Sequence, residues 1–86
     1  MVYYLERVGV DGGDFVTSLR ELRLSRMLSQ RDLAAAAQVS PKTIVDLELG
    51  RVEPHLKTMR KLAAALGVEP LEVEEFRQAI EEKVAA

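Results

Sequence analysis

One stretch of twenty residues, 30–49, constrains the fold of this chain more than any other feature. Its apolar residues have the spacing of two short helices that meet at a tight turn and cross steeply. A minimal side chain, Ala34, stands where the two helices come closest. Such a pair leaves one face of the second helix uncovered. The positions expected to be buried are Leu33, Ala37, Val39, Ile44 and Leu47.

Both helices of this pair have clear start signals. Ser29 and Asp32 have the form of a capping box, in which each side chain accepts a hydrogen bond from the backbone of the other residue. Ser40 can cap the second helix, and Pro41 suits its first position, where the missing N–H has no partner in any helix. The sequence therefore predicts sharp starts at about residues 30 and 41.

Further helices are expected before and after this pair. Asp14 can cap a first helix that ends at about 24–27. Another helix is predicted at about 55–66, and Gly67 suits its C-terminal end because glycine accepts the left-handed conformation found there. The first of these helices has an apolar face that carries Phe15, Leu19 and Leu22.

A fifth helix is predicted at about 70–84, with Pro70 in its first turn. Its apolar stripe is flanked by charged residues, and in so small a chain such a stripe is expected to pack against another apolar surface. Val73 and Phe76 favour the core of the same molecule, whereas the outer residues suit a second copy. The stripe continues with Ile80 and Val84, and the candidate dimer surface consists of Phe76, Ile80 and Val84.

The 86 residues are enough for one domain, which we expect at 15–86. Residues 1–14 are expected to form an arm and a loop, because 1–10 has no helical period and Asp-Gly-Gly-Asp follows at 11–14. The first ten residues lack the basic start and apolar run of a signal peptide. No later stretch is long and apolar enough to span a bilayer. We therefore expect a soluble, cytoplasmic protein without membrane contact.

The formal net charge of −2 conceals an uneven distribution. Residues 15–68 hold nine basic and five acidic side chains and have a net charge of +4. Residues 69–86 have a net charge of −4, and residues 1–14 have −2. The basic charge therefore lies on the helix pair and its neighbours, where it is compatible with a nucleic-acid partner.

The sequence offers little to catalysis or metal binding. It has no cysteine, so it has neither a disulfide framework nor a thiolate metal site. The single histidine, His55, cannot form a zinc site without other ligands. We find no nucleophile beside a base and no glycine-rich phosphate loop. We therefore expect no enzyme activity, cofactor or metal.

A set of residues stands at fixed offsets along 19–73: Arg23, Leu28-Ser29-Gln30, Val39-Ser40, Glu48, Gly50, Pro54 and Leu66-Gly67-Val68. With these residues in register, the segment from Leu19 to Val73 resembles the helix-turn-helix domain of phage repressors and Cro, also called lambda repressor-like or XRE-type. So many matches at fixed offsets are far more specific than one tripeptide. The resemblance implies an all-α, compact five-helix domain with an N-terminal arm.

The resemblance also implies a function. It predicts a sequence-specific transcriptional regulator, a repressor, that binds double-stranded operator DNA as a homodimer with its recognition helix, 41–49, in the major groove. It further implies a buried structural ion pair between Arg23 and Glu48. The base-reading residues would be Pro41, Lys42, Thr43 and Asp46. The DNA backbone contacts would be Gln30, Arg31, Ser40, Arg51, His55 and Lys57.

Two of the base-reading candidates have a competing explanation. Lys42 can donate to guanine, and Asp46 can accept from cytosine or adenine. They also stand four residues apart on one helix, the spacing of a weak ion pair. We expect this pair to form in the free protein, and we expect Asp46 to restrict rather than strengthen DNA binding.

Some positions depart from the family pattern and keep other functions open. Gln38 stands where glycine is usual, Leu49 replaces a polar residue, and His55 stands where serine often caps a helix. The chain could instead be a protein-interaction module, such as the antitoxin of a toxin–antitoxin pair or a helix-turn-helix cofactor that does not bind DNA. A protein partner would then use the acidic C-terminal helix. The DNA-binding end of a longer regulator is a third alternative.

Overall fold

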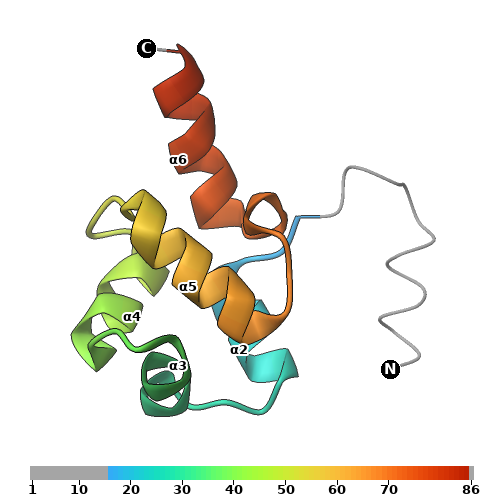
Figure 1. Ribbon diagram of the computed structural model, residues 1–86, viewed down its shortest axis with the longest axis vertical. Helices are drawn as coiled ribbons and strands as arrows, with labels where there is room; N and C mark the ends of the chain where they lie inside the picture. Colours follow the sequence, from blue (N-terminus) through green and yellow to red (C-terminus); the bar gives the residue numbers. More distant parts are fainter. Residues whose placement is uncertain (1–15, 86) are drawn as a thin grey trace, which may run out of the picture.

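The computed structural model describes residues 16–85, and its regular structure there is helical apart from one isolated bridge. The expectation of an all-α domain with five α-helices is confirmed for this range (Figure 1). The expected arm at 1–14, with Asp14, and the position of Phe15 lie outside it. The elements are α2 (Leu19–Ser25), α3 (Gln30–Ala37), α4 (Pro41–Glu48), α5 (Leu56–Leu66), the 3₁₀ turn η1 (Pro70–Glu72) and α6 (Glu74–Ala85).

The first helix of the described residues, α2, begins later than the sequence predicts. Ser18 caps α2: its Oγ accepts from the backbone of Glu21 at 3.1 Å, and the Glu21 carboxylate accepts from the backbone of Ser18 at 3.4 Å. Thr17 is not helical, because its N–H donates to the carbonyl of Glu72 at 2.9 Å and its own carbonyl accepts from Glu74 at 2.9 Å. The prediction of a start at Asp14 is therefore wrong.

The helix pair α3–α4 begins and turns as predicted. The backbone of Asp32 donates to Ser29 Oγ at 2.9 Å, and the backbone of Ser29 donates to the Asp32 carboxylate at 3.1 Å. Hydrogen bonds from the backbone and then the side chain of Ser29 lower the pKa of Asp32. Ser40 caps α4 through the backbone N–H of Thr43 at 3.2 Å. Gln38 ends α3 with a left-handed φ of 59°, the conformation that favours glycine there.

The predicted C-terminal helix is divided in two. Pro70–Glu72 forms the 3₁₀ turn η1, Val73 is extended with φ −94° and ψ 122°, and α6 starts only at Glu74. The break lies at Val73, which forms a parallel bridge with Thr17. The residues that precede α2 and α6 are therefore joined. The preceding helix, α5, ends at Gly67 with a φ of 73°, as predicted.

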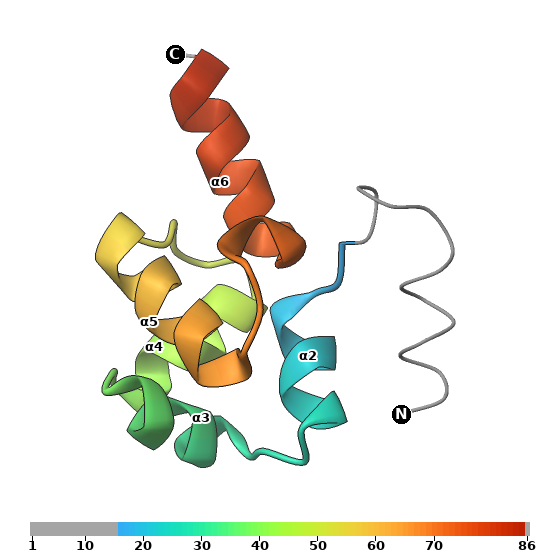
Figure 2. The ribbon, with the colours of Figure 1, turned by 45° about the vertical axis from the view of Figure 1, so that its right-hand side comes forward.

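A single core lies between the helices. α3 packs against both α4 and α5, and α2 packs against α4 (Figures 1 and 2). The residues predicted to be buried in the helix pair are buried, except that Val39 is only partly covered. The largest fully buried side chains are Phe76, Leu19, Leu33, Ile44, Leu47, Met59, Leu62 and Val73.

The two ends of α6 differ in their surroundings. Phe76 is fully buried, so the expectation that it belongs to a dimer surface is wrong: it lies one turn after the break and completes the core. Ile80 is partly buried against the core, whereas Val84 is 81% exposed. Figure 2 shows the C-terminal end of α6 extending away from the other helices. Within residues 16–85, no helix is long and apolar enough to cross a membrane.

Candidate nucleic-acid interface

A buried ion pair fixes the end of α4 to α2. Arg23 Nε lies 2.6 Å from Glu48 Oε2 and Arg23 Nη2 lies 3.0 Å from Glu48 Oε1, and the two side chains are only 8% and 5% exposed. The hydrogen bond with Glu48 is the main cause that raises the pKa of Arg23, against the opposing effect of burial. The Arg23 guanidinium therefore stays charged, and its contact with Glu48 holds α4 in one orientation.

Two further contacts join the Arg23–Glu48 pair to the start of α3, and we call the pair together with Leu28 and Gln30 the anchor. Arg23 Nη1 donates to the carbonyl of Leu28 at 2.9 Å, which places the turn before α3. Gln30 Nε2 donates to Glu48 Oε1 at 3.1 Å, so Gln30, a predicted backbone contact, is half-buried and already has a protein partner. The sequence places Gln30 at the start of α3 but does not indicate this link to α4. The anchor therefore joins α2, α3 and α4 at one point.

The first turn of α4 faces solvent. Pro41 and Lys42 are exposed, and Thr43 is half-buried with its hydroxyl 2.9 Å from that of Ser40. These are the residues at which a recognition helix would approach base edges. Most of the predicted backbone contacts are also exposed: Arg31, Ser40, Arg51, His55 and Lys57.

Asp46 differs from the other predicted base-reading residues because it is buried, with 8% of its surface exposed. Its Oδ2 accepts a hydrogen bond from Lys42 Nζ at 2.7 Å, the ion pair that the spacing predicts. Its Oδ1 lies 3.8 Å from Arg51 Nη1. The structure therefore brings together three of the predicted site residues, two from α4 and one from the following loop.

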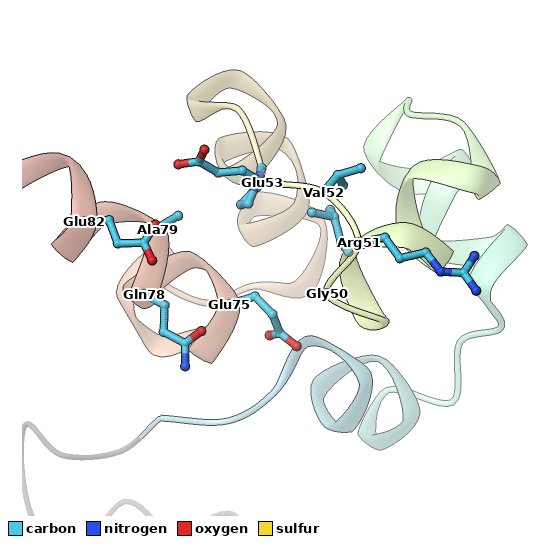
Figure 3. A pocket seen from close by; sticks show the side chains of 10 residues that line it. Gly50, Arg51, Val52, Glu53, Glu75, Gln78, Ala79 and Glu82 are labelled. Atoms are coloured by element: carbon cyan, nitrogen blue, oxygen red, sulfur yellow. The ribbon is translucent and has the colours of Figure 1, made fainter.

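The loop after α4 turns at Gly50, whose φ is 72°. The backbone N–H of Arg51 then donates to the carbonyl of Asp46 at 2.8 Å. Figure 3 shows the Arg51 side chain extending from the loop away from the labelled residues of α6. The loop thus presents its arginine on the α4 side of the molecule.

The N-terminal end of α5 adjoins the same surface. His55 is its N-cap residue but makes no side-chain capping hydrogen bond. A hollow of about 230 Å³ separates this end of α5 from α4, and it is lined by residues of both helices. Uncapped N–H groups at a helix start suit a phosphate oxygen. The lining includes Thr43, Asp46, His55 and Thr58.

A second hollow lies on the other side of the loop. It has a volume of about 320 Å³ and opens between residues 50–54 and α6 (Figure 3). Its α6 wall includes Glu75 and Glu82, so this hollow has an acidic side. Glu75 Oε1 accepts a hydrogen bond from the backbone N–H of Leu19 at 2.9 Å. Glu53 Oε2 of the loop lies 3.7 Å from Lys83 Nζ of α6. The acidic side chains of α6 are therefore separated from the exposed face of α4 by the loop, whereas Glu53 of the loop lines both hollows.

Comparisons with known proteins agree with this geometry. A helix-turn-helix family model matches residues 19–73. The chain is 48% identical over 50 residues to the HTH-type transcriptional regulator DdrOP3 of Deinococcus deserti, an alignment that covers 58% of this chain and 39% of that protein. It is 41% identical over 56 residues to an uncharacterized HTH-type transcriptional regulator of Methanothermobacter thermautotrophicus, covering 65% of this chain and 81% of that protein.

The chain therefore spans about two fifths of the length of the first relative and about four fifths of the second. No solved structure matches it. The family match includes α2 to α5 and the break at Val73, so it covers the anchor, the exposed turn of α4 and the start of α5.

Proposed function

We propose, from the premise that this chain belongs to the Cro/C1-type helix-turn-helix family, that it binds double-stranded DNA and regulates transcription. One observation carries the proposal. The second helix of the motif, α4, is held from beneath by the buried pair of Arg23 and Glu48, while its first turn faces solvent with Pro41 and Lys42 exposed. A rigid helix with an exposed N-terminal turn is what major-groove reading requires.

The contacts divide into two kinds. In our proposal α4 enters the major groove, where Lys42 donates to guanine acceptors and Thr43 lies near base or phosphate. Arg51, Lys57 and the uncapped start of α5 hold phosphates, which gives affinity but no sequence preference. The net charge of +4 on residues 15–68 supports this arrangement.

We extend the proposal to a homodimer that represses by occupying a two-fold symmetric operator. The outer end of α6 supports it, because Val84 is exposed and Ile80 is only partly covered there. Such a regulator would act in the cytoplasm, where a prokaryotic cell keeps its DNA. The family is one of transcription regulators rather than enzymes, and the proposed activity needs no cofactor.

Selection from a random duplex library tests this function. The purified chain, at near-physiological salt, should enrich a palindrome with half-sites about 10 bp apart. The affinity of the selected duplex should fall steeply with salt. A library with no enriched sequence, and equal weak affinity for every duplex, would contradict a sequence-specific regulator.

A protein-interaction role is the second candidate, and the acidic outer part of α6 favours it. This part extends away from the other helices (Figure 1) and carries Glu81 and Glu82 beside the exposed Val84. An antitoxin would use it to bind a small basic toxin. A neighbouring reading frame for such a protein, and a complex that survives gel filtration when the two are made together, would support this role.

A further inference from the structure

We propose that Asp46 is a positioning residue, which holds Lys42 and Arg51 ready for DNA and contacts no base itself. The proposal rests on the DNA-binding function proposed above. It assigns to Asp46 a role different from the base reading that the sequence pattern implies.

The burial of the three side chains is the first observation. The Asp46 side chain is 11% exposed, whereas those of Lys42 and Arg51 are 82% and 66% exposed. The carboxylate thus lies beneath two cations that reach solvent. A base edge in the groove would meet the cations before it could meet the carboxylate.

The geometry at Lys42 is the second observation. A lysine ammonium has three donors on a flexible four-carbon stem. One donor is used at 2.7 Å by Asp46 Oδ2, and two stay available for a partner. Because the stem is already held, less side-chain entropy is lost when the ammonium meets a base or phosphate. Asp46 therefore orients Lys42 and leaves two of its three hydrogen-bond donors available for DNA.

Arg51 is held to the same residue by its backbone as well as its side chain. Its N–H donates to the carbonyl of Asp46 at 2.8 Å, and its guanidinium lies 3.8 Å from the carboxylate. The guanidinium keeps most of its donors, because the separation is that of an ion pair rather than a hydrogen bond. One buried aspartate therefore sets the position of a predicted base contact and of a predicted phosphate contact.

Loss of the carboxylate charge should have two opposite effects on DNA binding. It removes a negative charge near the phosphates, so affinity for unrelated duplexes should rise. It also releases Lys42 and Arg51 from their fixed positions, so the advantage of the preferred duplex should shrink. A base-reading carboxylate would behave differently, because its loss would change the preferred base at one operator position.

The test compares Asp46→Asn with a control, Glu81→Gln, which removes the same charge from the exposed outer part of α6. Affinity is measured for the selected duplex and for a scrambled one. The affinity for the selected duplex divided by that for the scrambled one measures discrimination. We expect this ratio to fall at least about twofold more in Asp46→Asn than in the control, with the preferred sequence unchanged. An altered base preference at one position, or a ratio equal to that of the control, overturns the proposal.

The same substitution is then made in a chain that already carries Lys42→Ala and Arg51→Ala. Because Asp46 is proposed to affect discrimination between duplexes only through these two side chains, Asp46→Asn should now lower the ratio of the two affinities no more than Glu81→Gln does. A larger fall of that ratio that persists in this background shows that Asp46 touches the bases or acts by another route, and the proposal is then wrong.

The mobility of the lysine side chains can be measured on the unmodified protein, without DNA and without any substitution. NMR relaxation should show the Lys42 ammonium to be more ordered on the ps–ns timescale than that of Lys57, which is exposed and has no ion pair within the described range. Equal mobility of the two lysines contradicts the positioning role. If no duplex is selected, the DNA-binding function fails, and this comparison still decides whether Asp46 positions Lys42.

Discussion

Two carboxylates on α4, Glu48 and Asp46, form ion pairs of different kinds. Glu48 pairs with Arg23, and both side chains are buried. Asp46 is also buried, but its partner Lys42 is almost fully exposed. The first pair joins α4 to α2, and the second joins two residues of the same helix. The difference distinguishes a contact that fixes the helix from one that leaves a cation available at its surface.

The energetics of the two pairs should differ in the same way. Breaking a fully buried pair leaves one charge without a partner inside the protein, where water cannot solvate it. The free energy of unfolding should therefore fall strongly. A pair with one exposed partner gains little, because water and salt screen it and the lysine loses entropy when held. Stability should therefore depend on the buried pair, and recognition of DNA should depend on the half-exposed one.

The largest effect should come from breaking the buried pair. Glu48→Ala leaves the Arg23 guanidinium without its bidentate partner, and we expect the free energy of unfolding to fall by about 3–5 kcal/mol. Urea denaturation followed by circular dichroism measures the change.

The control for that substitution is Arg77→Ala, which breaks the 3.8 Å pair with Glu81 on the surface of α6. It should cost at most about 1 kcal/mol. Equal losses of stability in the two variants would contradict the distinction between buried and exposed pairs.

Lys42→Ala tests the half-exposed pair. Stability should change little, whereas discrimination against a wrong base pair should fall by about 1–3 kcal/mol at one operator position. Repeating the duplex selection with this variant shows whether the preferred sequence relaxes at that position. A sequence preference identical to that of the unmodified chain would remove Lys42 from the base-reading set.

Arg51→Ala should have a more uniform effect. We expect weaker binding to all duplexes alike, because phosphate contacts do not distinguish sequences. The slope of log affinity against log salt concentration should decrease by about 1. A change of sequence preference without a change of slope would place Arg51 at a base rather than at the backbone.

The smallest effect concerns a third carboxylate, Asp32, in the capping box of α3. Hydrogen bonds from Ser29 lower its pKa, so its contribution to stability is present above the unfolded value of about 3.9 and is lost as pH falls through the folded pKa. The difference in unfolding free energy between Asp32→Ala and the unmodified chain should therefore be larger at pH 7 than at pH 3. An unchanged difference would show that the hydrogen bonds do not favour the ionised form.

Local signals predicted most of the helix pair. Ser29 with Asp32, and Ser40 with Pro41, are short patterns whose partners lie within three residues, so the starts of α3 and α4 follow from sequence alone. The family resemblance added the pair of Arg23 and Glu48, which stand 25 residues apart and have no local pattern that joins them.

Long-range contacts account for what the sequence did not predict. The start of α2 moved to Leu19 and the last helix broke at Val73 because Thr17 and Val73 pair with each other across the domain. The spacing of Lys42 and Asp46 predicted their ion pair, but it indicated neither the burial of Asp46 nor its second partner, Arg51 of the following loop. Base reading and backbone contact by the other site residues stay predictions.

An NMR titration of the isotope-labelled chain with the selected duplex tests the central claim most directly. If α4 is held by its buried pair and presents its exposed turn to DNA, shifted backbone resonances should gather at residues 40–46 and 51–57. Shifts that gather on α6 and spare the first turn of α4 would contradict the account.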